Sequence, residues 1–228
     1  MSKTVPVPSP ALTPAQSIER LVALLDVESL GDDRFRGHST EAGWQRVYGG
    51  QVIAQALMAA SKTVPESRPA HSLHAYFMRP GDPRESIVYK VERDRDGASF
   101  SSRRIIALQY GKPIFSMSAS FQVEETGLEH SSAMPQVAGP DGLLNELELH
   151  IANADRIPES HRALWLTRDR PIEFRPVDPG DPLQPEACEA QSYHWFRPAA
   201  AVPEVEPAAR PALARCLLAY ASDMTLLD

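Results

Sequence analysis

An acidic side chain near the end of the sequence has the surroundings of a general base. Asp223 follows Ser222 in the segment LLAYASDMTLLD, residues 217–228, where most neighbours are apolar. A positioned carboxylate can accept the proton of a water molecule and so make that water a nucleophile. The commoner role of such a residue is structural, because Asp often caps a helix or ends a turn. The residues alone therefore leave both interpretations of Asp223 open.

The run Gly49-Gly50-Gln51 is a second candidate site, since it begins a segment with helical character. Backbone amides at a helix N-terminus can stabilise a developing oxyanion. Glycines at that point let a ligand approach the backbone closely. Close packing of the helix against a sheet explains the same glycines equally well. Gln51 stands where Asp223 stands in the later segment, so we expect no base at this first position.

For the other residues that could take part in chemistry, the sequence mostly favours structural roles. His71 and His74 lie in a predicted strand, where residues three apart point to opposite faces, so we expect structural histidines and no metal site. Arg103 and Arg104 alternate in the same way; one of them could meet phosphates, or both could be solvated. The sequence also lacks a G-x-S-x-G motif, which counts against a serine hydrolase of the α/β-hydrolase type.

The elements that must position these residues follow from periodicity. The segment from Gly49 to Ala60 is apolar around nearly its whole circumference, which predicts a buried helix. Strands follow in series, separated by short Gly-containing turns, and short turns favour an antiparallel meander. Their expected ranges are 71–80, 86–94, 99–110 and 112–123. One buried helix followed by a meander predicts a sheet curled around that helix.

The flanking regions are less regular. We expect a capped helix after Thr13, a short strand at 34–38, a helix near 142–153, strands near 172–176 and 191–197, and a helix from Pro211 to the chain end. The predicted organisation is a loose lead-in over residues 1–14, a first module over 15–125, a linker over 126–160 and a partial second module over 161–228.

Composition excludes several classes of protein. The net charge of −7 argues against general nucleic-acid binding, which needs a basic surface. No apolar run approaches 18 residues, so we expect no membrane span. Cys188 and Cys216 form no C-x-x-C pair, and buried free thiols fit a reducing cytoplasm better than a disulfide does.

A short echo links the two candidate sites. The segment that starts Tyr48-Gly49-Gly50-Gln51 resembles the segment that starts Tyr220-Ala221-Ser222-Asp223. Seven residues are weak support for an internal repeat. If the echo is real, a second buried helix opens at Asp223, and a second module needs about as many following residues as the first.

Three longer segments are similar to a known family. YGGQVIAQALMAA, HSLHAYFMRPGDP and RDGASFSSRRIIALQYGKPIFSMSASFQ resemble the first half of the acyl-CoA thioesterase II (TesB-like) family. LLAYASDMTLLD resembles the motif of that family's second half. The resemblance implies an α+β double hotdog fold, in which each module is a helix wrapped by an antiparallel sheet, with the second module incomplete in this chain.

The resemblance also implies a reaction. Family members hydrolyse fatty acyl-CoA to free fatty acid and coenzyme A without a metal or redox cofactor, and Asp223 corresponds to the Asp that orients the water. The hydroxyl residue and the Gln that assist this Asp in the family lie further downstream, and Thr225 is too close to Asp223 to take the hydroxyl role. Gly49, Gly50 and Gln51 become candidate contacts for the substrate.

These inferences combine into one expectation with an alternative. We expect a cytoplasmic acyl-CoA thioesterase whose activity is impaired by C-terminal truncation, associating as a homo-oligomer through its hotdog sheets. An uncovered helix face and open strand edges should favour such association. The alternative is a non-catalytic hotdog module that binds acyl-CoA or serves only in assembly.

Overall fold

The structure is a computed structural model that describes residues 12–40, 45–181, 183–184, 186–187, 189–207 and 209–224. The chain forms two compact units. One comprises Leu21–Leu128 together with the chain from Glu204 onward, and it contains every predicted site residue. The other comprises the chain up to Arg20 together with Glu129–Pro203. These two units do not test the predicted division into a first module, a linker and a partial second module, which stays a prediction.

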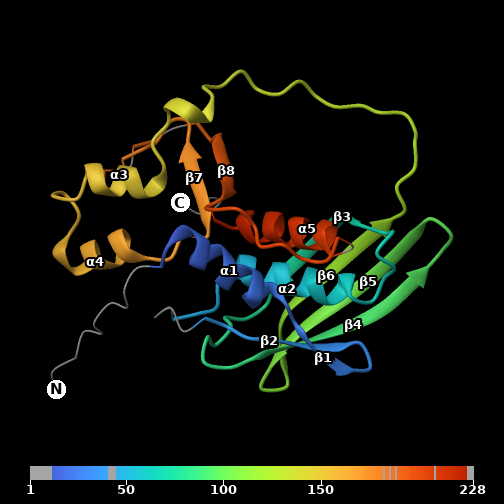
Figure 1. The fold of residues 1–228 in the computed structure, drawn as a ribbon. Coiled ribbons are helices and arrows are strands. Elements are labelled where there is room, and N and C mark those ends of the chain that lie inside the picture. The colour runs from blue at the N-terminus through green and yellow to red at the C-terminus, as the bar shows by residue number, and fades with distance from the viewer. Residues whose placement is uncertain are drawn as a thin grey trace, which may run out of the picture. The chain divides into compact units, whose positions relative to one another are not determined.

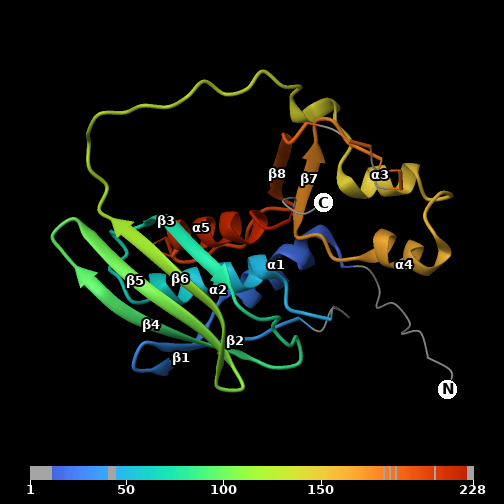
Figure 2. The same ribbon diagram turned by 180° about the vertical axis from the view of Figure 1, so that it is seen from behind.

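The larger unit is built on a six-stranded antiparallel sheet (Figure 2). Its strand order is β1-β2-β4-β5-β6-β3. The strands are β1 (Glu28–Gly31), β2 (Arg34–Gly37), β3 (Ala70–Phe77), β4 (Ile87–Asp96), β5 (Phe100–Gln109) and β6 (Lys112–Gln122). The meander is confirmed for β4, β5 and β6. It is wrong for β3, which pairs with β6 at the edge of the sheet and not with β4.

The prediction for β3 failed because the segment after this strand, residues 78–82, bonds to residues distant in the sequence. The N–H groups of Met78 and Arg79 donate to the carbonyl of Ile114, at 2.8 and 3.1 Å. The side-chain amide of Gln109 accepts from the N–H of Asp82 and donates to its carbonyl, at 2.8 and 2.9 Å. The segment is thus fixed against the β5–β6 hairpin. It forms a crossover loop, where the sequence suggested a tight turn.

The buried helix is α2 (Gly49–Ser61), and the curled sheet packs around it. Ten of its residues are buried, including polar Gln51 and Gln55. On β6 the apolar residues Phe115, Met117, Ala119 and Phe121 are buried and alternate with serines, as the sequence predicts. The fold expected from the resemblance, a helix wrapped by an antiparallel sheet, is confirmed for this unit.

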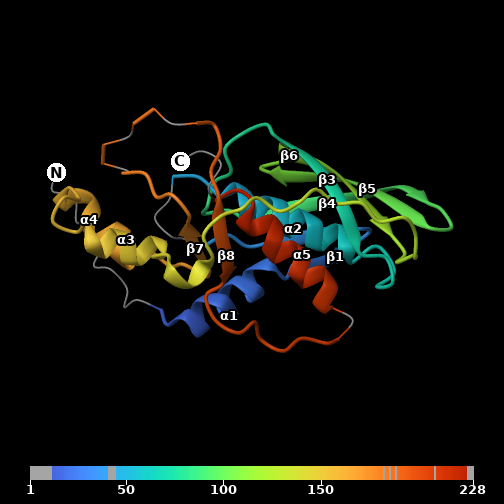
Figure 3. The ribbon, with the colours of Figure 1, turned by 90° about the horizontal axis from the view of Figure 1, so that it is seen from above.

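The second helix of this unit, α5 (Arg210–Ala221), packs along α2 (Figures 1 and 3). The prediction of a helix from Pro211 to the chain end is wrong, because α5 ends at Ala221 and a turn follows. Tyr48 precedes α2, whereas Tyr220 lies in the last turn of α5. The two tyrosines thus sit at opposite ends of their helices and are not equivalent positions, and Asp223 follows a helix. A second helix opening at Asp223 would run into residues 225–228, which lie outside the described residues.

A buried arginine fastens the end of α2 to the sheet. The Arg103 side chain is 1% exposed and makes five hydrogen bonds. Two of them go to Thr63, just past α2, and one goes to the Asp96 carboxylate. The neighbouring Arg104 side chain is 52% exposed and pairs with acidic residues of β4, Glu92 among them. The predicted alternation of the two arginines is therefore confirmed.

The smaller unit contains a two-stranded antiparallel sheet, β7 (Ile172–Pro176) and β8 (His194–Pro198). Its helices include α3 (Glu146–Ala152), which Asn145 begins with a capping box, and α4 (Glu159–Thr167). A short 3₁₀ helix, η1 (Pro140–Gly142), precedes α3. The strands and α3 lie close to where the sequence predicts them. Helix α1 (Pro14–Leu25) continues from this unit into the larger one, with the expected Thr13–Gln16 capping contacts.

The structure bears on two further expectations, the free thiols and the membrane span. Cys216 is a buried free thiol, and burial raises its pKa to about 12; Cys188 lies outside the described residues. Among the helices in the described part of the chain, none has the length and apolar character needed to cross a membrane.

Candidate active site

The predicted base lies at the N-terminus of the buried helix. The N–H of Gly50, in the first turn of α2, donates to Oδ2 of Asp223 at 2.9 Å. Asp223 itself follows the end of α5, so the site forms where the start of α2 meets the end of α5. Among the described residues, Gly50 is the one recorded hydrogen-bond partner of this carboxylate. That bond engages Oδ2, and no described residue is recorded as a partner of Oδ1.

Two opposing effects act on the pKa of Asp223. Burial raises the pKa, because removal from water disfavours the charged form. The hydrogen bond from Gly50 lowers it, because the donor stabilises the carboxylate. Burial is the larger effect, so the pKa lies above the ordinary value of 3.8. A carboxylate in this state is a stronger base than one in open water.

The glycines are required by this close approach of two backbones. A methyl group on Gly49 would lie 2.5 Å from Oδ2 of Asp223 and 2.8 Å from the ring of Phe77. A methyl group on Gly50 would overlap the carbonyl oxygen of Tyr220. The space that a side chain would fill is thus occupied by the end of α5 and its carboxylate. Close packing is therefore observed, but chiefly against the end of α5 and less against the sheet, where the sequence predicted it; Phe77 of β3 is the sheet contact.

Gln51 lies beside this site but its side chain is turned elsewhere. It is 3% exposed, and its amide nitrogen donates to the carbonyl of His38 at 3.0 Å and to the hydroxyl of Ser39 at 3.3 Å. The structure therefore brings Gly49 and Gly50 together with Asp223, while the Gln51 amide is engaged with the segment before α2. A contact between Gln51 and a substrate stays a prediction.

Sequence reasoning missed one residue of this site. The hydroxyl of Tyr48 donates to the carbonyl of Tyr220 at 2.8 Å, and the two rings meet edge to face at 5.0 Å. The position of Tyr48 directly before the glycine run could have indicated a role at this site. We used Tyr48 only in the comparison of the two similar segments, because sequence does not show that the start of α2 and the end of α5 touch.

Both histidines of β3 lie on one face, contrary to the prediction. A bulge between Ala70 and Ser72 shifts the register. The His71 ring thereby reaches the hydroxyl of Ser120 at 2.8 Å, on the face that His74 shares through its pairing with Ser118. The rule that residues three apart point to opposite faces holds only for an unbulged strand. The described residues contain no group of three or more His, Cys, Asp or Glu side chains that could hold a metal ion.

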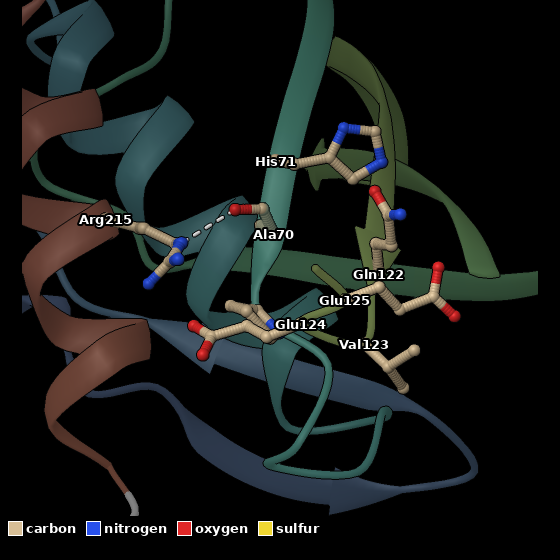
Figure 4. Close-up of a pocket in the computed structure, with 8 residues that line it drawn as sticks. Ala70, His71, Gln122, Val123, Glu124, Glu125 and Arg215 are labelled. Atoms are coloured by element: carbon tan, nitrogen blue, oxygen red, sulfur yellow. Dashed lines mark hydrogen bonds between the residues drawn. The ribbon is translucent and has the colours of Figure 1, made fainter. Parts of the chain in front are cut away.

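A cavity of about 410 Å³ lies elsewhere in the larger unit, at the opposite end of β3. Figure 4 shows its lining, with Arg215 of α5 bonded through Nε to the carbonyl of Ala70 at 2.7 Å. None of the predicted site residues lines it. The lining residues are Pro69, Ala70, His71, Gln122, Val123, Glu124, Glu125 and Arg215.

Comparisons with known proteins show which family this chain resembles. A family model described as the acyl-CoA thioesterase N-terminal domain matches residues 40–122. The chain is 38% identical to acyl-CoA thioesterase 2 of Haemophilus influenzae over 90% of its own length and 70% of the relative's. It is 37% identical to human acyl-coenzyme A thioesterase 8, with 91% of this chain and 66% of the relative covered.

A solved structure extends the similarity to the fold. The crystal structure of the acyl-CoA thioesterase II TesB2 from Mycobacterium marinum matches with a TM-score of 0.67 and 37% identity. The match covers 92% of this chain and 68% of that one. The chain thus spans about two thirds of the length of the relatives it matches.

Proposed function

The chain belongs to the acyl-CoA thioesterase II family, and from that premise we propose that it hydrolyses fatty acyl-CoA to free fatty acid and coenzyme A, with Asp223 as the base. The observation that carries the role of Asp223 is its 2.9 Å hydrogen bond to the Gly50 N–H at the start of α2. This contact puts a carboxylate of raised pKa beside the positive end of a helix, and such a junction suits hydrolysis.

The proposed reaction needs one proton acceptor and one anion-stabilising environment. Asp223 accepts a proton from water while the water oxygen attacks the thioester carbonyl carbon. The carbonyl oxygen takes up negative charge, and the positive end of α2 stabilises it. The carbon–sulfur bond then breaks and the carbonyl re-forms as the acid. The leaving sulfur takes the proton that Asp223 accepted, which gives the thiol of coenzyme A and restores the carboxylate. The Gly50 bond fixes one oxygen of Asp223, so that the other can orient the water.

The test is removal of the base with its shape retained. Asp223→Asn keeps the size of the side chain and an oxygen that can accept from Gly50, but it loses the proton acceptor. We expect a fall in kcat/KM of roughly 10²- to 10⁴-fold, the usual contribution of a general base. Release of the coenzyme A thiol from fatty acyl-CoA measures it, with the exposed Asp32→Asn as the matched control. Equal rates for wild type and Asp223→Asn would exclude Asp223 as the base.

A second candidate function is a hotdog module that binds acyl-CoA or assists assembly without hydrolysis. It is favoured by the same hydrogen bond, because a carboxylate that caps the first turn of a helix has a sufficient structural role. Binding of a non-hydrolysable acyl-CoA analogue by a protein with no turnover of acyl-CoA would support this alternative. Turnover that depends on Asp223 would exclude it.

The activity of the 228-residue polypeptide alone stays a separate prediction. The family resemblance implies a hydroxyl residue and a Gln as further ligands of the water. The low turnover of acyl-CoA that the sequence analysis expects of this polypeptide therefore stays a prediction. The measurement is its rate against that of any longer polypeptide that contains it, and robust turnover by the 228-residue form would contradict the expectation.

We also propose how the chain associates and in which compartment it works. β3 lies at an edge of the sheet and exposes Leu73, Tyr76 and Phe77, which supports a homo-oligomer formed through the sheets. The buried free thiol of Cys216 supports a reducing cytoplasm. Light scattering tests the first proposal, and a stable monodisperse monomer would contradict it.

A further inference from the structure

The last carbonyl groups of α5, the helix that directly precedes the proposed base, accept hydrogen bonds from identified donors. The last carbonyls of a helix lack partners within the helix and must find them elsewhere. Three find local donors: Leu218 accepts from the Ser222 N–H, Ala219 from the Ser222 hydroxyl, and Ala221 from the Met224 N–H, at 3.0, 2.8 and 3.1 Å. Tyr220 accepts from a distant residue, because its carbonyl receives the hydroxyl of Tyr48 at 2.8 Å.

Tyr48 thus makes one of two recorded long-range hydrogen bonds between this turn and other described residues. It stands 172 residues from its acceptor and directly precedes α2 as the N-cap residue, although its side chain makes no capping bond. It instead crosses to the last turn of α5. The second crossing bond, from the Gly50 N–H to Asp223, lies two residues further along α2. The two bonds join the same pair of helix ends.

The pairing restricts where Asp223 can lie. The hydroxyl of Tyr48 holds the backbone at position 220, three residues before the carboxylate, and the Gly50 N–H holds the carboxylate itself. The edge-to-face contact of the two tyrosine rings fixes the same segment from the side. Without the hydroxyl, the turn at 221–223 keeps its local bonds but loses one of the two hydrogen bonds that join it to the start of α2. A carboxylate on that turn can then drift from the Gly50 amide.

We propose that Tyr48 is a positioning residue, whose hydroxyl sets the end of α5 against α2 so that the Asp223 carboxylate is held at the Gly50 N–H. It acts through Asp223 and does not itself touch the reacting atoms. The effect of Tyr48 on catalysis rests on the proposed function, whereas its effect on the position of Asp223 does not. The two parts are therefore tested by separate readouts.

The geometric readout is the Gly50 amide resonance in a ¹H–¹⁵N spectrum recorded across a pH titration. A carboxylate that accepts from an amide makes the amide proton shift titrate with the carboxyl group, and Asp223→Asn gives the reference with no such titration. We expect Tyr48→Phe, which removes only the hydroxyl, to reduce this titration toward that reference. Tyr110→Phe is the matched control, because it also removes one phenol hydroxyl. Tyr110 lies on the turn between β5 and β6, and its hydroxyl bonds to Asp82 at 3.0 Å. It should leave the Gly50 signal as in wild type.

The catalytic readout is the division of the effect between kcat and KM. Loss of one hydrogen bond that positions the base should lower kcat roughly threefold to tenfold and leave KM within about twofold. Tyr110→Phe should change neither value. An unaltered Gly50 titration in folded Tyr48→Phe overturns the proposal whatever the rates are. A lost titration, together with equal hydrolysis by wild type and Asp223→Asn, leaves the positioning in place and removes the proposed function instead.

A reciprocal measurement covers the case in which Tyr48→Phe does not fold. Incorporation of 3-fluorotyrosine keeps the ring and the hydroxyl, and the ¹⁹F resonance of Tyr48 reports its surroundings. If the two crossing bonds are coupled, Asp223→Ala, which removes the acceptor of the Gly50 N–H, should shift this resonance and leave that of Tyr110 in place. A Tyr48 resonance unchanged by Asp223→Ala would overturn the proposal.

Discussion

Two charged groups lie at opposite ends of α2, and they differ in burial and in hydrogen bonding: Arg103 is buried, whereas Asp223 is partly buried. Beyond the C-terminal end, Arg103 is 1% exposed and makes five hydrogen bonds, which match the five N–H donors of a guanidinium. At the N-terminal end, the Asp223 carboxylate has one recorded partner among the described residues, and burial raises its pKa. One charge is fully satisfied, and the other is left with acceptor capacity to spare.

The difference indicates which group can do chemistry. A buried charge with every donor engaged has nothing left for a ligand, and removing it strands its partners, so its role is structural. A partly desolvated charge with an unused oxygen costs stability, and such groups gather at functional sites. The contrast therefore indicates a structural role for Arg103 and supports the proposal that Asp223 is the base, and each role can be tested on its own.

The largest effect on stability is expected at Arg103. Lysine in its place supplies one compact ammonium where a planar fork now reaches Thr63, Asp96 and the Arg95 carbonyl. We expect Arg103→Lys to lower the free energy of unfolding by about 2–4 kcal/mol, because several buried acceptors lose their donors. Urea denaturation measures the change. The adjacent Arg104→Lys is the control and should cost less than about 0.5 kcal/mol, since its ion pairs are exposed. Equal losses for the two variants would remove the contrast.

A smaller effect of opposite sign is expected at Asp223. Because the folded-state pKa is raised, the group favours the folded state fully below the unfolded-state pKa, and that contribution is lost as the pH rises through the folded-state pKa. At neutral pH the ionised carboxylate therefore opposes folding, and Asp223→Asn should raise the melting temperature slightly. The gain should appear as the pH rises above about 4 and vanish below it. A clear fall in melting temperature at pH 7 would mean that the capping role dominates.

The sequence predicts most of the framework around this contrast. The alternation Phe115, Met117, Ala119 on β6 and the all-round apolar surface of α2 are local patterns, and both are confirmed. The position of β3 was missed, because it depends on contacts of Asp82 and Ile114 with distant parts of the chain. A bulge at His71 reversed the expected faces for the same reason, since no short-range pattern specifies it.

The site was predictable in its parts but not in its assembly. The sequence nominates Asp223 from its apolar neighbours and Gly50 from its place in a glycine run. It leaves open whether the glycines serve packing or a ligand, and the structure joins the two questions, because the packing brings the acid to the amide. Tyr48 escaped notice because its partner is a backbone carbonyl of α5, which carries no sequence signature.

The most direct test of the central claim is the pH dependence of kcat/KM for a fatty acyl-CoA, measured for the wild type and for Asp223→Asn. If Asp223 is the base, the wild-type rate should rise with pH through an apparent pKa above the ordinary value of 3.8, as the carboxylate ionises. The residual activity of Asp223→Asn should lack this limb. An acid limb of the same midpoint in both proteins would contradict the account, because the titrating base would then be a different group.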